Sequence, residues 1–309
     1  MISDHRTYEQ SKIEKRPRRP KSKIPMMPLR KFAIHQPKTI AEASQMLAQF
    51  GDKGRLYAGG TELLLAMKHD LLRYEHLIDV KTIVNLNQIE VKNGALLIGS
   101  TATHRAIEKS PLVQQNLAVL AEMETKVANI RVRASGTLGG NLCFAEPHSD
   151  PATLLTALGA KAHVQGKSAA RSVGVDKLIT GAYETSLAAD ELLASVEIPL
   201  LTKSQRAAYL KFQLKERPTL GLALVLDLDG DTIKKASAVV GSVSAVPTQS
   251  DKANGLLTGA RSQVERQLSD AAEALAQAAD PVDDLEGGAD YKRHLIGVFL
   301  RRAFIQALS

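Results

Sequence analysis

Two glycine pairs in this sequence have the composition of backbone loops that bind anions. They lie in residues 58–61 (AGGT) and residues 137–141 (TLGGN). Because glycine has no Cβ, several backbone N–H groups of such a loop can converge on one anion at short range. Neither pair belongs to a P-loop or to a G-x-G-x-x-G dinucleotide fingerprint. Each loop alone is more typical of a turn, but together the two could enclose a pyrophosphate.

The patterns around the first loop predict that it lies at the start of a helix. Residues 40–50 carry an apolar stripe of helical spacing that ends at a glycine. Residues 54–70 then predict a short strand, a glycine turn and a new helix with Thr61 as its cap, and residues 76–80 predict a buried strand. Alternating strands and helices favour parallel pairing. The loop would therefore offer free N–H groups and the positive end of a helix dipole to a phosphate.

The second loop lies in a stretch with a different pattern. Residues 95–100 predict a strand, and residues 111–128 predict a helix that Pro111 opens. The loop then lies after a helix and before a strand, and a further helix begins near Pro151. Residues 192–199 supply one more strand, which Pro199 ends.

From about residue 205, strands give way to helices. Residues 207–215 and 219–243 predict strands, with a turn at Asp229-Gly230, and residues 261–280 and 290–308 predict helices. Residues 1–25, 26–87, 88–200 and 205–309 thus form a leader, two α/β lobes and a third lobe with an antiparallel sheet. The fold class is α+β.

Composition limits the classes of function. The chain has 309 residues, of which 44% are hydrophobic and 24% charged, as expected for a globular protein of two or more domains. Its single cysteine, Cys143, excludes an intrachain disulfide and a self-sufficient four-cysteine zinc or iron–sulfur site. No apolar run reaches the roughly 18 residues of a membrane span.

The positive charge of the chain is concentrated in the leader. Residues 1–25 contain eight Lys or Arg and three Asp or Glu, so five of the seven net positive charges lie there. Such a Pro- and Lys-rich segment is too polar to fold alone, and a disordered tail is favoured over an arm that binds an anionic partner. The body is almost neutral, contains no Trp and has few aromatic residues. We therefore expect no nucleic-acid partner.

Other residues near the loops suggest chemistry but favour simpler interpretations. Glu146, His148 and Asp150 alternate like metal ligands on a strand, but Pro147 indicates a loop, so we expect no metal there. Cys143 is more typical of a small buried residue than of a nucleophile. Core packing is the favoured role for the nearest aromatic residues, which are Tyr57, Phe144, Tyr209 and Phe212.

Several longer motifs resemble a known family. They are LYAGGTELLLAMK followed by LIDV, ASGTLGGNLCFAEPHSDPATLLTALGA, ELLASVEIP, YLKFQLKERPTLGLALV, VVGSVSAVPTQ and YKRHLIGVFLRRA. In this order they resemble the FAD-binding medium subunit of molybdenum hydroxylases, of the carbon monoxide dehydrogenase, xanthine dehydrogenase and aldehyde oxidoreductase type. The resemblance covers the chain from about residue 27 to its C-terminus. It implies a bilobal FAD-binding domain of the vanillyl-alcohol oxidase-like type in residues 26–200, and the family's C-terminal domain in residues 205–309.

The resemblance also implies a set of FAD-binding residues. Both glycine loops would wrap the FAD diphosphate, with backbone N–H groups and the hydroxyls of Thr61 and Thr137 as donors. Asp150 would accept hydrogen bonds from sugar or ribityl hydroxyls, and Lys211 could balance cofactor charge. The motif around Lys211 lacks the acidic residue often found near its end, so the alignment is less certain there. The full set is Ala58, Gly59, Gly60, Thr61, Glu62, Thr137, Leu138, Gly139, Gly140, Asn141, Asp150, Leu193 and Lys211.

The function implied by this resemblance is electron transfer. A large molybdopterin subunit would oxidise the substrate, a small subunit with [2Fe–2S] clusters would relay electrons, and FAD in this chain would pass them to NAD⁺, a quinone or oxygen. The flavin carries the redox chemistry, so no catalytic acid or base is expected here. A cytoplasmic heterotrimer, commonly doubled, is the implied assembly. The alternative is a stand-alone FAD-dependent oxidoreductase on the same fold.

Overall fold

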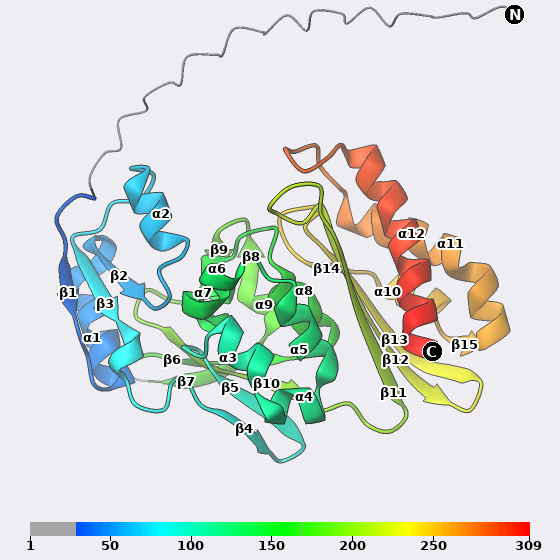
Figure 1. Ribbon diagram of the computed structural model, residues 1–309, viewed down its shortest axis with the longest axis horizontal. Coiled ribbons are helices and arrows are strands. Elements are labelled where there is room, and N and C mark those ends of the chain that lie inside the picture. Colours follow the sequence, from blue (N-terminus) through cyan, green and yellow to red (C-terminus); the bar gives the residue numbers. More distant parts are fainter. Residues whose placement is uncertain (1–28, 168) are drawn as a thin grey trace, which may run out of the picture.

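Three sheets follow one another along the chain, each with its own helices (Figure 1). The computed structural model describes residues 29–167 and 169–309, and the basic leader predicted in residues 1–25 lies outside the described residues. The first sheet is parallel, with the order β1-β3-β2. Its strands are β1 (Ala33–His35), β2 (Gly54–Tyr57) and β3 (His76–Asp79).

Local signals in the sequence define the helices of the first lobe. Helix α1 (Ile40–Phe50) begins where the Thr39 hydroxyl accepts a hydrogen bond from the Glu42 N–H, and it ends at Gly51, whose φ is +50°. Short turns η1 (Gly51–Lys53) and η2 (Val80–Thr82) flank the sheet. Helix α2 (Leu63–Lys68) follows the first glycine loop, as predicted. Its cap residue is Glu62 rather than Thr61, and no side chain caps it.

The second sheet is antiparallel and has the order β4-β5-β10-β6-β7. Its strands are β4 (Ile89–Lys92), β5 (Ala95–Gly99), β6 (Lys161–Gln165), β7 (Ala170–Gly174) and β10 (Leu192–Pro199). A small pair, β8 (Ile179–Gly181) and β9 (Glu184–Thr185), lies beside it. The helices of this lobe are α3 (His104–Lys109), α4 (Pro111–Asn116), α5 (Ala118–Thr125), α6 (Ile130–Ser135), α7 (Leu138–Phe144), α8 (Asp150–Ala157) and α9 (Val175–Leu178).

Two predictions in this lobe were wrong. The single helix expected over residues 111–128 is two helices, because Leu117 has a non-helical φ of −151°. The second glycine loop does not precede a strand but opens helix α7. Thr137 caps this helix through its Oγ1, which accepts from the Gly140 N–H, while Leu138 and Leu142 are both fully buried one turn apart. Capping and burial outweigh the poor helix propensity of the two glycines.

The third lobe packs helices on one face of a long antiparallel sheet. Strands β11 (Gln205–Phe212), β12 (Leu220–Asp229), β13 (Thr232–Gly241) and β14 (Thr248–Gln249) pair in this order, and β15 (Gly259–Ala260) joins β13. The predicted turn at Asp229-Gly230 joins β12 to β13, with Gly230 at a φ of +59°. Helices α10 (Asp251–Leu256), α11 (Arg261–Ala279) and α12 (Ala289–Leu308) complete the lobe. None of the helices in the described parts of the chain combines the length and apolarity that a bilayer crossing requires.

The sheet of the third lobe contributes to two cores at once. Leu222, Leu224 and Leu226 pack with α11 and α12, whereas Ala223 and Val239 belong to the core of the second lobe. This alternation follows from the period of two in a strand. Figure 1 shows the resulting order, with α8 on one side of strands β12 and β13 and α12 on the other. The second and third lobes are therefore joined by a shared apolar layer.

Candidate functional site

The two glycine loops meet, although about eighty residues separate them in the chain. A β-carbon on Gly59 would collide with the Ser135 carbonyl oxygen and would lie 2.7 Å from the Cα of Gly136. A β-carbon on Gly136 would lie 3.4 Å from the Thr61 Oγ1. The first loop therefore packs backbone against backbone on the residues that lead into the second loop. Only glycine at position 59 permits this approach.

A cavity of about 580 Å³ opens where the loops meet. Twelve of the thirteen predicted FAD-binding residues line it; the exception is Leu138, which is fully buried in the core of the second lobe. Leu193 contributes an apolar part of the wall from β10, next to an irregularity in its pairing with β6. The structure thus brings together residues from all three lobes around one cavity.

The two loops differ in the hydrogen bonds that their N–H groups already make. Within residues 29–167 and 169–309, the N–H groups of Gly60, Thr61 and Glu62 have no protein acceptor. In the second loop, by contrast, the N–H groups of residues 138–141 donate to Ala102 O (3.0 Å), Ser100 O (2.9 Å), Thr137 Oγ1 (3.0 Å) and Thr137 O (2.9 Å). Of the N–H donors expected from both loops, those of residues 138–141 already have protein acceptors, so free N–H groups are found in the first loop.

The second loop offers side chains and close approach instead of N–H groups. The Thr137 Oγ1 accepts from Gly140, which leaves its own hydrogen to be donated. The Asn141 Oδ1 accepts from the Ser149 hydroxyl at 2.6 Å, so its amide NH₂ group remains a donor. Gly139 and Gly140 add no side chain between these groups and the cavity.

Asp150 and Lys211 form a buried ion pair across the boundary between the second and third lobes. The Lys211 Nζ lies 2.8 Å from the Asp150 Oδ2, and the Tyr209 hydroxyl donates to the Asp150 Oδ1 at 2.6 Å. Burial raises the pKa of Asp150, while Lys211, Tyr209 and His104 oppose that shift. Because Asp150 balances the charge of Lys211, that lysine contributes little net charge toward a cofactor.

Arg217 ties the three lobes together at the rim of the cavity. It lies between β11 and β12, where its guanidinium pairs with Glu146 and lies 3.7 Å from the Glu62 carboxylate. The His148 Nδ1 lies 2.9 Å from the Glu146 Oε1, and its Nε2 lies 3.2 Å from the Asp284 Oδ2. Hydrogen bonds to these carboxylates raise the pKa of His148. The side chain of Glu62 is thus directed to Arg217, away from any repulsion with a phosphate.

The metal-like alternation of residues 146–150 has a different explanation in the structure. Glu146 and His148 pair with each other, whereas Asp150 binds Tyr209 and Lys211. Across the described residues, no group of three or more His, Cys, Asp or Glu side chains is arranged to hold a metal ion. Of the four aromatic residues near the motifs, Phe144 lines the cavity, while Tyr209 is buried and Phe212 packs on Tyr291 and Phe299.

Among the polar cavity residues that sequence reasoning missed are Ser100, Thr101 and His104. They lie between the end of β5 and the start of α3, directly under the second loop. A signal was present in the sequence, because GSTATH (residues 99–104) ends the predicted strand of residues 95–100 and contains four side chains that can form hydrogen bonds. Its contact with the glycine loops depends on tertiary structure.

Cys143 lines the cavity in surroundings that disfavour its thiolate form. Burial raises the pKa of its thiol to about 12, so almost no thiolate exists near neutral pH. We expect a thiol reagent such as Ellman's reagent to react with the folded chain more than about 100-fold slower than with the unfolded chain. Since this is the single cysteine of the chain, the measured rate reports on Cys143 alone. Equal rates would contradict the raised pKa of its thiol.

Comparisons with known proteins give matches over nearly the whole of the described chain. Residues 30–201 match the family model of the FAD binding domain in molybdopterin dehydrogenase, and residues 210–307 match that of the CO dehydrogenase flavoprotein C-terminal domain. The carbon monoxide dehydrogenase medium chain of Afipia carboxidovorans is 33% identical over 279 residues, which cover 89% of this chain and 96% of that protein. The medium chain of Hydrogenophaga pseudoflava is 31% identical over 280 residues, which cover 90% and 97%.

Solved structures agree with these sequence matches. A chain of reconstituted CO dehydrogenase from Oligotropha carboxidovorans has a TM-score of 0.87 and 31% identity, covering 91% of this chain and 99% of that chain. Both family models together span nearly all of the described residues, and the two glycine loops fall within the FAD-binding one. The chain therefore belongs to the family of FAD-binding medium subunits of molybdenum hydroxylases, which are oxidoreductases.

Proposed function

We propose that this chain binds FAD between its two glycine loops and transfers electrons within a molybdenum hydroxylase complex. It receives electrons from [2Fe–2S] clusters of a small subunit, after a large molybdopterin subunit has oxidised the substrate. An external acceptor, NAD⁺, a quinone or oxygen, then takes them from this subunit. When bound, the flavin supplies the redox chemistry, and the chain binds and orients it and sets its surroundings.

The contact between the two loops is the observation that carries the proposal. A site for a diphosphate needs several donors and no side chains between them and the ligand. The N–H groups of Gly60, Thr61 and Glu62 meet that need, because they have no protein acceptor among the described residues and border the cavity. A β-carbon at Gly59 would collide with the backbone of Ser135 and Gly136 and force the two loops apart. The residues present thus fit an elongated anionic ligand such as the FAD diphosphate.

The remaining predicted residues would hold other parts of FAD. We infer that the hydroxyls of Thr61 and Thr137 and the amide of Asn141 donate to the diphosphate or the sugar. Asp150 has one further lone pair on each oxygen, which could accept from a ribityl hydroxyl while its bonds to Tyr209 and Lys211 persist. Leu193 would contact an apolar face of the cofactor.

We also infer the finer features that the family implies for this chain. Residues 26–200 would form a bilobal domain of the vanillyl-alcohol oxidase-like type, and residues 205–309 the C-terminal domain of the molybdenum hydroxylase flavoprotein subunit. The interval between β10, which ends at Pro199, and β11, which begins at Gln205, supports this boundary. The assembly would be a cytoplasmic heterotrimer of large, medium and small subunits, commonly doubled.

Purification of the full chain with its co-expressed partner subunits tests the proposal. We expect a yellow complex whose visible spectrum has flavin bands, and the supernatant after denaturation should contain FAD. The substrate of the complex should reduce the flavin only when the large and small subunits are present. Reduction of the flavin by an organic substrate without those subunits would favour a stand-alone oxidoreductase. A folded complex that never takes up FAD would contradict the proposal.

A further inference from the structure

His104 lies at the joint between the two glycine loops. Its backbone N–H donates to the Gly136 carbonyl at 3.0 Å, and its side chain lines the cavity while being almost fully buried. A β-carbon on Gly136 would lie 3.2 Å from the His104 Cδ2 and 3.4 Å from the Thr61 Oγ1. The imidazole ring, the first loop and the start of the second loop therefore converge on one point of the cavity wall.

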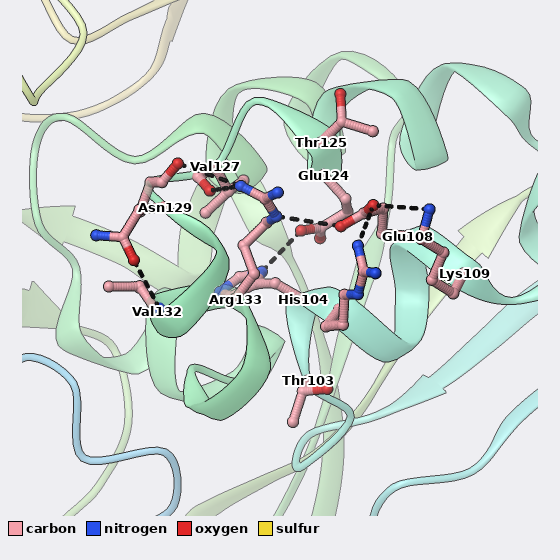
Figure 2. A network of polar contacts seen from close by, with 12 residues as sticks. Thr103, His104, Glu108, Lys109, Glu124, Thr125, Val127, Asn129, Val132 and Arg133 are labelled. Carbon is pink, nitrogen blue, oxygen red and sulfur yellow. Dashed lines mark hydrogen bonds and ion pairs between the residues drawn. The ribbon is translucent and has the colours of Figure 1, made fainter.

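A buried carboxylate fixes the orientation of this ring. The His104 Nδ1 lies 2.8 Å from the Glu124 Oε2, and Glu124 is fully buried on α5 (Figure 2). In the tautomer with its proton on Nδ1, the ring donates to Glu124, because an ionised carboxylate only accepts. The other oxygen, Oε1, is buried without a hydrogen-bond partner among the described residues. A buried carboxylate that is only half satisfied is costly, and such a group calls for an explanation.

No neighbouring lysine or arginine of the described residues forms a hydrogen bond or ion pair with the buried carboxylate of Glu124. The guanidinium of Arg133, which Figure 2 shows beside this pair, is used elsewhere. Its Nε donates to the Glu108 Oε2 at 3.1 Å and its Nη1 donates to the Val127 carbonyl at 2.9 Å. His104 is thus the single side chain of the described residues that hydrogen-bonds to Glu124. The negative charge of Glu124 is therefore available to balance a positive charge on the ring of His104.

The other basic side chains on the cavity wall have partners of their own. Lys211 pairs with Asp150, Arg217 with Glu146 and Glu62, and His148 with Glu146 and Asp284, while Arg55 lies over the ring of Tyr74. Within the described part of the chain, the Nε2 of His104 forms no hydrogen bond and is not sealed from the cavity. The N–H groups of the second loop, directly beside it, are already used.

We propose that His104, oriented by Glu124, binds the diphosphate of FAD through its Nε2–H. This inference rests on the proposed function and adds a charged donor on the side of the second loop, where free N–H groups are missing. With Nδ1 held by Glu124, donation from Nε2 requires a proton on both ring nitrogens, so the bound ring would lie between a carboxylate and a diphosphate in charge-assisted hydrogen bonds. Glu124 is a positioning residue, since it acts through His104.

Two substitutions of His104 separate binding from structure. In His104→Asn the amide nitrogen replaces Nδ1 and no donor remains at Nε2, whereas in His104→Gln the amide nitrogen replaces Nε2. We expect His104→Asn to weaken FAD and ADP binding by about tenfold or more, because it removes a charge-assisted hydrogen bond. His104→Gln should lose less affinity for FAD and ADP than His104→Asn does. Riboflavin, which has no diphosphate, should bind all three proteins within about twofold.

The measurement is a titration of the flavin-free full chain, alone and with its co-purified partner subunits, with melting curves to check folding. His163→Asn is the matched control, because His163 contacts Glu197 at 3.1 Å but does not line the cavity. If His104→Asn does not fold, Glu124→Gln takes its place, and it should also weaken the binding of FAD more than the binding of riboflavin. Unchanged FAD affinity, or equal losses for FAD and riboflavin, would overturn the proposal. A wild-type protein that binds no FAD would instead overturn the proposed function.

Discussion

Gly59→Ala is expected to lower the affinity for FAD by about 100-fold, which corresponds to roughly 3 kcal/mol. The added methyl group would collide with the carbonyl oxygen of Ser135 and lie 2.7 Å from the Cα of Gly136. Both are backbone atoms, so no side-chain rotation can make room. The two loops would have to separate, and the donors of the first loop would then no longer face those of the second. Titration of the flavin-free protein with FAD measures the loss.

The matched control for this substitution is Gly255→Ala. Gly255 lies in α10, where a β-carbon would meet no atom within 4 Å. Alanine is a better helix former than glycine, so the control should be neutral or slightly stabilising. Unaltered FAD affinity in Gly59→Ala would mean that the loops do not need their present contact, and the two-loop site would be wrong. Melting curves of flavin-free Gly59→Ala would reveal a variant that fails to fold.

Lys211→Met is expected to destabilise the folded chain by about 3 kcal/mol near neutral pH. It leaves the Asp150 carboxylate, whose side chain is 5% exposed, without its ammonium partner. Burial already raises the pKa of Asp150, and loss of Lys211, which opposes that shift, raises it further. The folded variant therefore binds a proton on Asp150 more tightly than the unfolded chain does. Its stability must fall as pH rises above the ordinary pKa of an aspartate.

Urea denaturation at about pH 5 and about pH 8 tests whether the stability of Lys211→Met falls as the pH rises. The difference in unfolding free energy between the wild type and Lys211→Met should be larger at the higher pH. In Asp150→Asn combined with Lys211→Met, where no charge remains to be buried, that dependence on pH should disappear. Lys234→Met is the control, because Lys234 pairs with Asp229 at the surface and should change stability by less than about 0.5 kcal/mol. A Lys211→Met penalty that is equal at both pH values would contradict a buried charge at Asp150.

Local patterns predicted most elements of the fold from the sequence. The parallel first sheet, the turn at Gly230 and the two long C-terminal helices follow from periodicity and glycine positions. Helix α7 was missed because its first turn contains two glycines, and its stability comes from the Thr137 cap and the burial of Leu138 and Leu142. The break at Leu117 was missed because no glycine or proline marks it.

The candidate site was predicted by family resemblance rather than by physics alone. Spacing did not require the two loops to meet, and either could have been an ordinary turn. The pairs His104–Glu124 and Arg217–Glu146 join residues far apart in sequence, each of which is equally typical of an exposed charged position. The roles of the thirteen residues toward FAD stay predictions, although twelve of them border one cavity.

The unequal hydrogen bonding of the two loops implies an order of assembly for the site. In the loop that opens α7, the N–H groups of residues 138–141 all have protein acceptors. This loop therefore reaches its final conformation during folding and gains little order when a ligand binds. In the loop before α2, the N–H groups of residues 60–62 have no protein acceptor among the described residues. Bound flavin would supply the acceptors that these groups lack. In hydrogen-exchange experiments, cofactor loading should then slow exchange at residues 60–62 and leave residues 138–141 nearly unaffected.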